Sequence, residues 1–284
     1  MKMFDALRQL TYRSWLVQPP AVWGKLPSHA DYVHYRATAQ QAHDWQKWVT
    51  EVWLRRPLQA RESDFTRASR RGRSNWLQLE VGVRTDLATV PVAFILQPGS
   101  LDFAPQHFIQ GVMVVSQDAV GRECPLIIYQ IATLPWMSQI WCEQEVQNQP
   151  SLTDVRESSN DHSRHLLYWL ARVAACVHAN EMTPETLCGA VDTVWQEFEP
   201  SWAQLMKKDR RRANTVALRA RLSRLGIGAS QDAAKGLKGV QQLPWANWPE
   251  RILRPQRPMP VFWQQDVNGG YVSASDNFQS LWKT

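Results

Sequence analysis

The sequence GVMVVSQDAVGRECPL, residues 111–126, decides the fold class of this chain. An apolar segment over 111–116 ends in polar residues, reverses near Gly121 and leaves through Pro125 into a second apolar segment. Short β-branched segments bounded by Gly, Pro and Asp are typical of strands. Two such strands joined by a polar turn predict a sheet at the centre of the fold.

Further strands and helices are predicted on either side of this turn. Strand composition recurs at Trp76–Val81, Pro91–Leu96 and Pro125–Ala132, and the last two are nearly continuously apolar, which predicts central strands covered on both faces. Helical spacing of apolar residues occurs over 42–53, 164–180, 183–198 and 210–225. The third helix opens with Thr183 as N-cap and Pro184 at its first position. Helices around buried strands predict an α/β fold.

The chain is expected to form one domain. Its 284 residues, of which 44% are hydrophobic, can bury a large core and fit one large domain or two modest ones, and we expect a single domain over 1–284. Asn268 and Gly269 are the expected turn of a late hairpin. The expected parts are a sheet core over 22–135, a helical portion over 158–225, a Gly/Pro-rich connecting loop over 226–260, and a closing hairpin with a short helix over 260–284.

Composition excludes several classes of protein. The sequence has no run of eighteen apolar residues and its first twenty residues lack the apolar core of a secretory signal, so a cytoplasmic location is expected. The four cysteines are scattered without a CxxC pair, which favours neither a disulfide framework nor a zinc site. We therefore expect buried or semi-buried thiols, no metal and no cofactor.

The arginines cluster in two places, Arg55–Arg73 and Arg210–Arg224, and the second cluster lies in a predicted helix. The net charge is +6, and the sequence DRRRANTVALRARLSRLGIG begins at Asp209. A solvated helix face, a site for an acidic protein partner and a nucleic-acid site are all compatible with this pattern. The apolar face of the helix is expected to consist of Val216, Leu218, Leu222 and Leu225. The possible basic interaction face consists of Arg210, Arg211, Arg212, Arg219, Arg221 and Arg224.

Catalytic motifs are weak in this sequence. The sequence VWGKLPSHADY, residues 22–32, lacks the first glycine and the hydroxyl residue of a phosphate-binding loop. Its Ser28, His29 and Asp31 have the residue types of a hydrolytic triad, but triad members normally come from separate elements. His162 and His165 stand at a predicted helix start, where a polar pair is commoner than a metal site. We expect no enzyme, and a hydrolase using Ser28 or Ser116 remains an alternative.

Two segments together resemble a known family, TagF of the type VI secretion system. Residues 22–32 are similar to its opening motif FGKLPxxGDF, and residues 97–126 resemble its later signature PG…GVxMPSVDxVGRxxPL. The departures include Ala30 in place of a glycine and Val114-Val115 in place of Met-Pro. The matching residues are Gly24, Lys25, Leu26, Pro27, Asp31, Pro98, Gly99, Gly111, Val112, Ser116, Asp118, Val120, Gly121, Arg122, Pro125 and Leu126.

The resemblance implies a fold and a function. It implies a three-layer α/β/α sandwich with a mixed central sheet and additional helices in the second half. It also implies a cytoplasmic type VI secretion accessory that represses secretion post-translationally by binding a component such as the forkhead-associated scaffold protein, without catalysis. A stoichiometric structural or assembly accessory of the machine is the alternative within this system. No nucleic acid or membrane insertion is expected.

Charged residues in the two motifs suggest a contact between them. Lys25 and Asp31 lie in the first motif, and Asp118 and Arg122 lie in the second. Because these charges are complementary, they can pair across the two loops, and a buried pair is costly to break on one side only. Two interpretations remain open at this point. The pairing either fixes the N-terminal segment on the sheet or shapes one rim of a partner surface.

Overall fold

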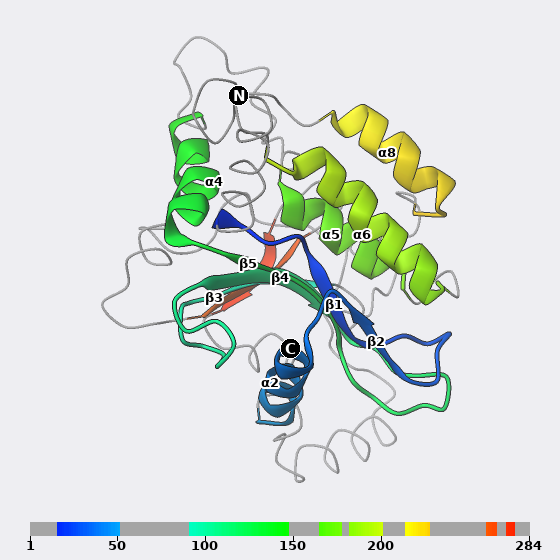
Figure 1. Ribbon diagram of the computed structural model, residues 1–284. Coiled ribbons are helices and arrows are strands. Elements are labelled where there is room, and N and C mark those ends of the chain that lie inside the picture. The colour runs from blue at the N-terminus through cyan, green and yellow to red at the C-terminus, as the bar shows by residue number, and fades with distance from the viewer. Residues whose placement is uncertain are drawn as a thin grey trace, which may run out of the picture.

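A seven-stranded sheet forms the centre of the fold (Figure 1). The computed structural model describes residues 16–51, 91–147, 165–177, 182–200, 214–227, 260–265 and 271–275. The strand order is β2-β1-β5-β4-β3-β6-β7. The strands are β1 (Ala21–Lys25), β2 (Tyr32–Tyr35), β3 (Val92–Leu96), β4 (Phe108–Val114), β5 (Leu126–Ala132), β6 (Val261–Gln265) and β7 (Tyr271–Ser275).

The α/β class is confirmed, but the expected mixed sheet is wrong for the described strands. Every pairing between them is antiparallel. Short connections link β3 to β4, β4 to β5 and β1 to β2, and such connections suit antiparallel neighbours because a parallel pair needs a long crossover. Continuous apolar character predicted burial on both faces correctly, but it carries no information on strand direction.

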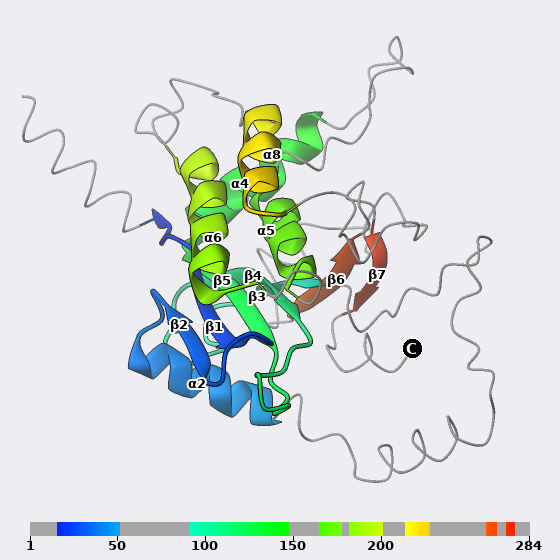
Figure 2. The ribbon, with the colours of Figure 1, turned by 90° about the vertical axis from the view of Figure 1, so that its right-hand side faces the viewer.

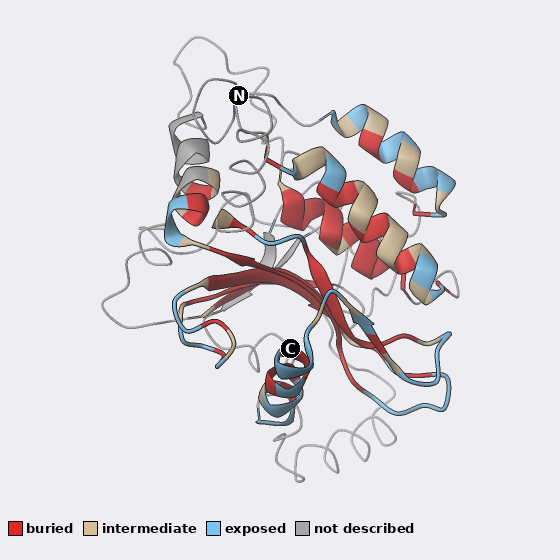
Figure 3. Ribbon diagram, viewed as in Figure 1, coloured by how far each residue is buried: buried red, intermediate tan, exposed pale blue. Residues whose placement is uncertain are grey.

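Successive residues of the central strands point to opposite faces of the sheet, as the two-residue period of a strand requires. In β3, Phe94 and Leu96 join one apolar cluster, whereas Ala93 and Ile95 join the other. β3, β4 and β5 are buried along their whole length (Figure 3). These strands therefore have a hydrophobic core on each face.

The helices cover the two faces unequally (Figures 1 and 2). One helix, α2, lies on one face and places Trp45 against Phe94 and Tyr129. The other described helices lie on the opposite face, where α5 packs on β4 and α6 packs on α5. The three-layer sandwich remains a prediction. The helices are α2 (Ala39–Val49), α4 (Leu134–Gln147), α5 (Leu166–Ala175), α6 (Pro184–Phe198) and α8 (Thr215–Arg224).

Side chains at the helix starts satisfy the free backbone N–H groups. Thr38 forms a capping box with Gln41 at the start of α2. Thr183 caps α6 and Pro184 follows it, as the sequence predicted. Asn214 caps α8 by accepting a hydrogen bond from the backbone N–H of Ala217, at 3.0 Å. These caps fix where the helices of the second half begin.

Several sequence predictions lie outside the described residues. They are the strand at Trp76–Val81, the turn at Asn268-Gly269, Arg210, Arg211, Arg212, His162, most of the loop over 226–260 and the terminal helix. β6 pairs with β7 in antiparallel register at the place where the sequence predicts the closing hairpin. Among the described residues, no helix is long and apolar enough to cross a membrane.

Candidate interaction site

A cluster of three charged residues joins the two motifs, and we call Lys25, Asp118 and Arg122 the Asp118 cluster. Lys25 is the last residue of β1, and its Nζ lies 2.7 Å from Asp118 Oδ2. The exposed fraction is 5% for the Lys25 side chain and 0% for that of Asp118. Arg122 Nε donates to the same oxygen at 2.6 Å, although 63% of the Arg122 side chain is exposed. The cluster is thus a buried ion pair capped by an exposed arginine.

The Asp118 side chain also organises its own turn. Its Oδ1 accepts hydrogen bonds from the backbone N–H groups of Val120, at 3.1 Å, and Arg122, at 2.8 Å. The turn closes with a bond from the Gly121 N–H to the Asp118 carbonyl oxygen, at 3.0 Å. Gly121 has a φ of +85°, which glycine adopts without the steric cost that a Cβ brings. The sequence D-A-V-G-R therefore encodes this turn locally.

The surroundings of Asp118 keep its carboxylate ionised. Burial on its own raises the pKa of a carboxyl group. Here the hydrogen bonds from Lys25 and from the backbone and side chain of Arg122 outweigh burial and hold the Asp118 pKa well below its usual range. Both carboxylate oxygens have donors, so the charge is compensated inside the protein.

Backbone contacts bind the two loops to each other beside the ion pair. The Ala119 N–H donates to the His29 carbonyl oxygen at 3.0 Å. Arg122 Nη2 donates to the Ala30 carbonyl oxygen at 2.7 Å. Asp31 instead accepts from the N–H of the next residue, Tyr32, and it forms no ion pair with the described residues. Lys25 therefore pairs across the loops, whereas Asp31 does not.

Gly24 allows the two loops to approach closely. Its φ is +134°, and an added Cβ would lie 2.1 Å from the Pro125 carbonyl oxygen and 2.8 Å from the Leu126 Cα. No side chain fits between these backbones. The neighbouring Leu26 is fully buried. The GKL segment of the first motif thus supplies close backbone packing, a buried ion pair and an apolar anchor.

Aromatic and thiol groups surround the buried ammonium. Lys25 Nζ lies 5.2 Å from the centroid of the Tyr32 ring, which stacks on Trp23. Burial raises the pKa of the Cys124 thiol to about 11 and is the largest cause that raises the Tyr32 pKa to about 12. Both groups therefore stay protonated at neutral pH. Cys124 is a buried thiol, as expected, and it is not poised as a nucleophile.

An exposed surface surrounds Arg122, the outermost member of the Asp118 cluster, and we define the rim as residues 28–31 and 119–123. All of these residues are exposed (Figure 3). Val120 is 67% exposed at the tip of the second loop. Val120 and Arg122 are thus both accessible on the rim, and arginine is enriched at protein–protein interfaces. The cluster thus has a structural interior and an accessible exterior.

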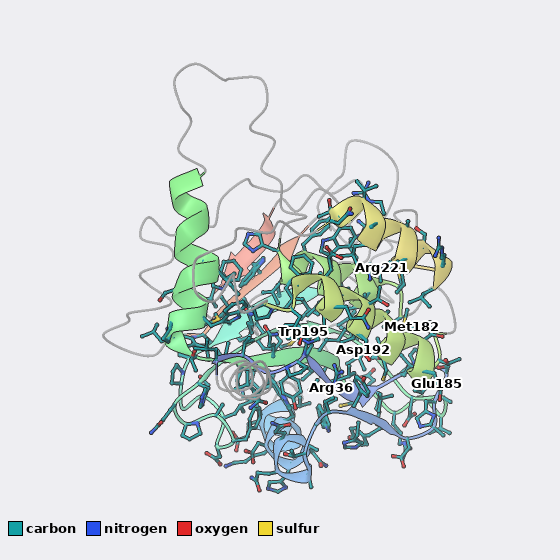
Figure 4. The ribbon with its side chains drawn as sticks, turned by 45° about the horizontal axis from the view of Figure 1, so that its top comes forward. Arg36, Met182, Glu185, Asp192, Trp195 and Arg221 are labelled. Carbon is teal, nitrogen blue, oxygen red and sulfur yellow. The ribbon has the colours of Figure 1, made fainter. Side chains whose placement is uncertain are left out.

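Three contacts connect this region to α6, and the sequence alone did not reveal them. Ser28 Oγ donates to the Met182 carbonyl oxygen at 2.6 Å, just before α6 begins. Tyr35 Oη donates to Asp192 Oδ2 at 2.7 Å, and Arg36 Nη1 lies 2.8 Å from Asp192 Oδ1 (Figure 4). Arg36 has a φ of 56°, an uncommon conformation for a residue with a Cβ. No local pattern predicts contacts between residues more than 150 positions apart.

The remaining predicted site residues are dispersed. Pro98 and Gly99 lie in the turn between β3 and β4, which is at the opposite end of β4 from Asp118. Ser116 is buried, and its hydroxyl has no hydrogen-bond partner among the described residues. His165 stacks on Trp141, with ring centroids 5.0 Å apart. No group of three potential metal ligands occurs in the described part of the chain.

The buried side of the basic helix α8 differs from the apolar face that the sequence predicted. Leu218 and Leu222 are buried, but Val216 is 80% exposed, so its placement on the buried face was wrong. Val216 lies two residues from Leu218, or about 200° around a helix, which turns it to the other side. Arg221 Nη2 lies 2.7 Å from Glu197 Oε2 and holds α8 against α6. Arg219 and Arg224 are exposed and form no ion pair with the described residues.

The loops and strands around the Asp118 cluster coincide with a known domain. Residues 21–153 match the family model described as the TagF N-terminal domain, type VI secretion system-associated. Residues 21–153 belong to the TagF family. The resemblance read from the two motifs is thereby confirmed, and the protein is type VI secretion system-associated. The TagF match runs from β1 into the segment after α4, so α5, α6 and α8 lie outside it.

Among solved structures, this chain is similar to PA0076 from Pseudomonas aeruginosa PAO1. The two share 14% sequence identity with a TM-score of 0.39, and the alignment covers 91% of this chain and 89% of that one. No curated protein matches this chain.

Proposed function

We propose that this protein is a cytoplasmic repressor of type VI secretion that acts after translation by binding a forkhead-associated scaffold protein. The observation that carries the proposal is the TagF match over residues 21–153. The proposal assigns no catalysis to the protein. Ser28, one of the two candidate nucleophiles, donates its hydroxyl proton to the Met182 carbonyl oxygen, and this supports binding over hydrolysis.

We assign the rim a role in scaffold binding. The ion pair beneath it is buried, whereas Val120 and the Arg122 guanidinium are accessible. A rigid loop with an exposed apolar tip loses little conformational entropy on binding, which favours affinity. The bonds from Ala119 to His29 and from Arg122 to Ala30 provide this rigidity.

Titration calorimetry with the purified chain and the purified forkhead-associated scaffold of the same bacterium tests the binding. We expect a saturable complex with the native chain, and at least about tenfold weaker binding for Val120→Asp, because it places a carboxylate at the contact. Leu134→Asp is the matched control, since Leu134 is also an exposed apolar residue but lies at the start of α4. Equal loss in both variants would remove the rim from the proposal.

Secretion assays test the repression. Deletion of the gene should raise secretion and overproduction should lower it. Unchanged secretion, together with a stable stoichiometric complex with another part of the machine, would instead establish the structural accessory.

A further inference from the structure

The largest local excess of positive charge lies over residues 207–224, and a second basic segment, residues 55–73, carries +5. Residues 207–224 contain eight Lys or Arg residues and one Asp, a net charge of +7. The whole chain carries +6, so all other residues together carry −1. α8 and the residues before it are therefore the more basic of the two Arg-rich parts of the chain.

One side of α8 packs on the protein. Leu218 and Leu222 are buried, and Arg221 pairs with Glu197 near the end of α6. Glu197 Oε1 also accepts a hydrogen bond from the backbone N–H of Asn214. These contacts fix the orientation of the helix (Figure 4).

The other side of α8 is exposed, and we call it the α8 face. It consists of Val216, Arg219, Ala220, Ser223 and Arg224. Each of these residues has another member of the set three or four positions away, so together they form one side of the helix. Val216 and Val120 are two of the three large apolar side chains that are exposed in the described part of the chain.

The composition of the α8 face argues against a lipid surface or a single-stranded nucleic acid as its ligand. A helix that binds a membrane surface inserts its apolar side, but Leu218 and Leu222 are already buried in the core. Sequence-tolerant binding of single strands uses aromatic side chains for stacking, and the α8 face has none. An exposed valine between arginines instead suits a protein surface, where arginine guanidinium groups bind carboxylates through paired hydrogen bonds.

We propose that the α8 face docks on an acidic surface of the scaffold protein. This inference rests on the proposed function and adds a second contact to the rim. α6 connects the two contacts, because Ser28 of the rim bonds to Met182 before its start and Arg221 of α8 pairs with Glu197 near its end. The 15 residues of α6 span about 22 Å, which sets the scale of the separation between the two contacts.

Calorimetry and stopped-flow association with the purified scaffold test the inference, using Arg219→Glu and Arg224→Glu. We expect each variant to bind at least about tenfold more weakly than the native chain, with slower association and a weaker dependence on salt. The matched control is Lys47→Glu, which makes the same charge change on an exposed side chain of α2, on the other face of the sheet. The control should bind within about twofold of the native chain.

The outcomes separate the two proposals. If the native chain binds the scaffold and the α8 variants bind equally well, the α8 inference is overturned and the proposed function stands. If the native chain does not bind the scaffold, the proposed function fails first. Vesicles of phosphatidylglycerol and phosphatidylethanolamine and a random-sequence DNA duplex serve as further probes. Binding to either one that Arg219→Glu abolishes, without loss of scaffold binding, would assign the face to another ligand and overturn the inference.

Discussion

The Asp118 cluster and the α8 face both carry arginines, but they differ in how far their charges are buried. In the cluster, Lys25 and Asp118 are buried and bonded to each other, and Arg122 closes them from outside. On the α8 face, Arg219 and Arg224 are exposed and form no ion pair with the described residues. The sequence shows charges in both places, and only their burial separates a structural role from an accessible one.

This difference has a physical consequence for mutagenesis. Removal of one partner of a buried ion pair leaves an uncompensated charge in the interior and destabilises the fold strongly. Exposed charges contribute little to stability, because water and salt screen them. Substitutions at the buried Lys25 and Asp118 should therefore lower the free energy of unfolding, and substitutions on the α8 face should lower the affinity for the partner.

The largest expected effect in the cluster region is steric. Gly24→Ala would place a Cβ 2.1 Å from the Pro125 carbonyl oxygen, at a backbone conformation that suits only glycine. We expect a loss of at least about 3 kcal/mol in the free energy of unfolding, measured by urea denaturation.

Gly121→Ala is the matched control for Gly24→Ala. Gly121 also has a positive φ, but no atom lies within 4 Å of an added Cβ. The cost should be only the conformational strain, about 1–2 kcal/mol. Equal losses in the two variants would contradict the close approach of the two loops at Gly24.

Acid should weaken the contact between the loops. The folded-state pKa of Asp118 is lowered, whereas the pKa of an aspartate in the unfolded chain is about 4. The stabilisation is therefore fully present above about pH 4 and is lost as the pH falls through the folded-state pKa. Urea denaturation across this range should show a steeper loss of stability in the native chain than in Asp118→Asn. Identical profiles would mean that the ionised Asp118 contributes nothing to folding.

The exposed member of the cluster should matter less to stability. Arg122→Ala removes the bonds to the Asp118 carboxylate and the Ala30 carbonyl, but it keeps the backbone N–H that bonds to Asp118. We expect a loss of about 1 kcal/mol or less, since the guanidinium is mostly exposed. Thermal unfolding measures this loss, and a fall as large as that of Gly24→Ala would place Arg122 with the structural interior.

The smallest stability effect is expected at the α8 face. The double variant Arg219→Glu/Arg224→Glu removes no ion pair or hydrogen bond with the described residues, so the free energy of unfolding should change by less than about 0.5 kcal/mol. Circular dichroism during urea denaturation provides this value. A larger loss would show that the two arginines stabilise the fold.

Much of the sheet and the helical portion could be predicted from the sequence. The burial of β3 and β5 on both faces followed from their apolar runs, and the start of α6 followed from Thr183 and Pro184. The antiparallel arrangement could not be predicted, because an apolar run has no direction. Val216 was misplaced because its apolar character was given more weight than its position two residues from Leu218.

The candidate site was predictable in part. The complementary charges of the two motifs suggested contact, and Lys25 does bond to Asp118. Charge alone does not distinguish Asp31 from Asp118, and the structure shows that Asp118 is buried whereas Asp31 is exposed. The contacts of Ser28 and Asp192 depend on the packing of α6, and no short pattern encodes that packing.

The most direct test measures the free energy of unfolding of Lys25→Met and the affinity of Val120→Asp for the scaffold. It asks whether the buried charges stabilise the fold while the exposed rim binds the partner. Methionine retains much of the length of the lysine side chain but leaves Asp118 without its buried partner. We predict that Lys25→Met loses about 3–5 kcal/mol of stability. Val120→Asp should keep its stability and lose binding. A Lys25→Met variant that unfolds like the native chain and fails only to bind the scaffold would contradict the account.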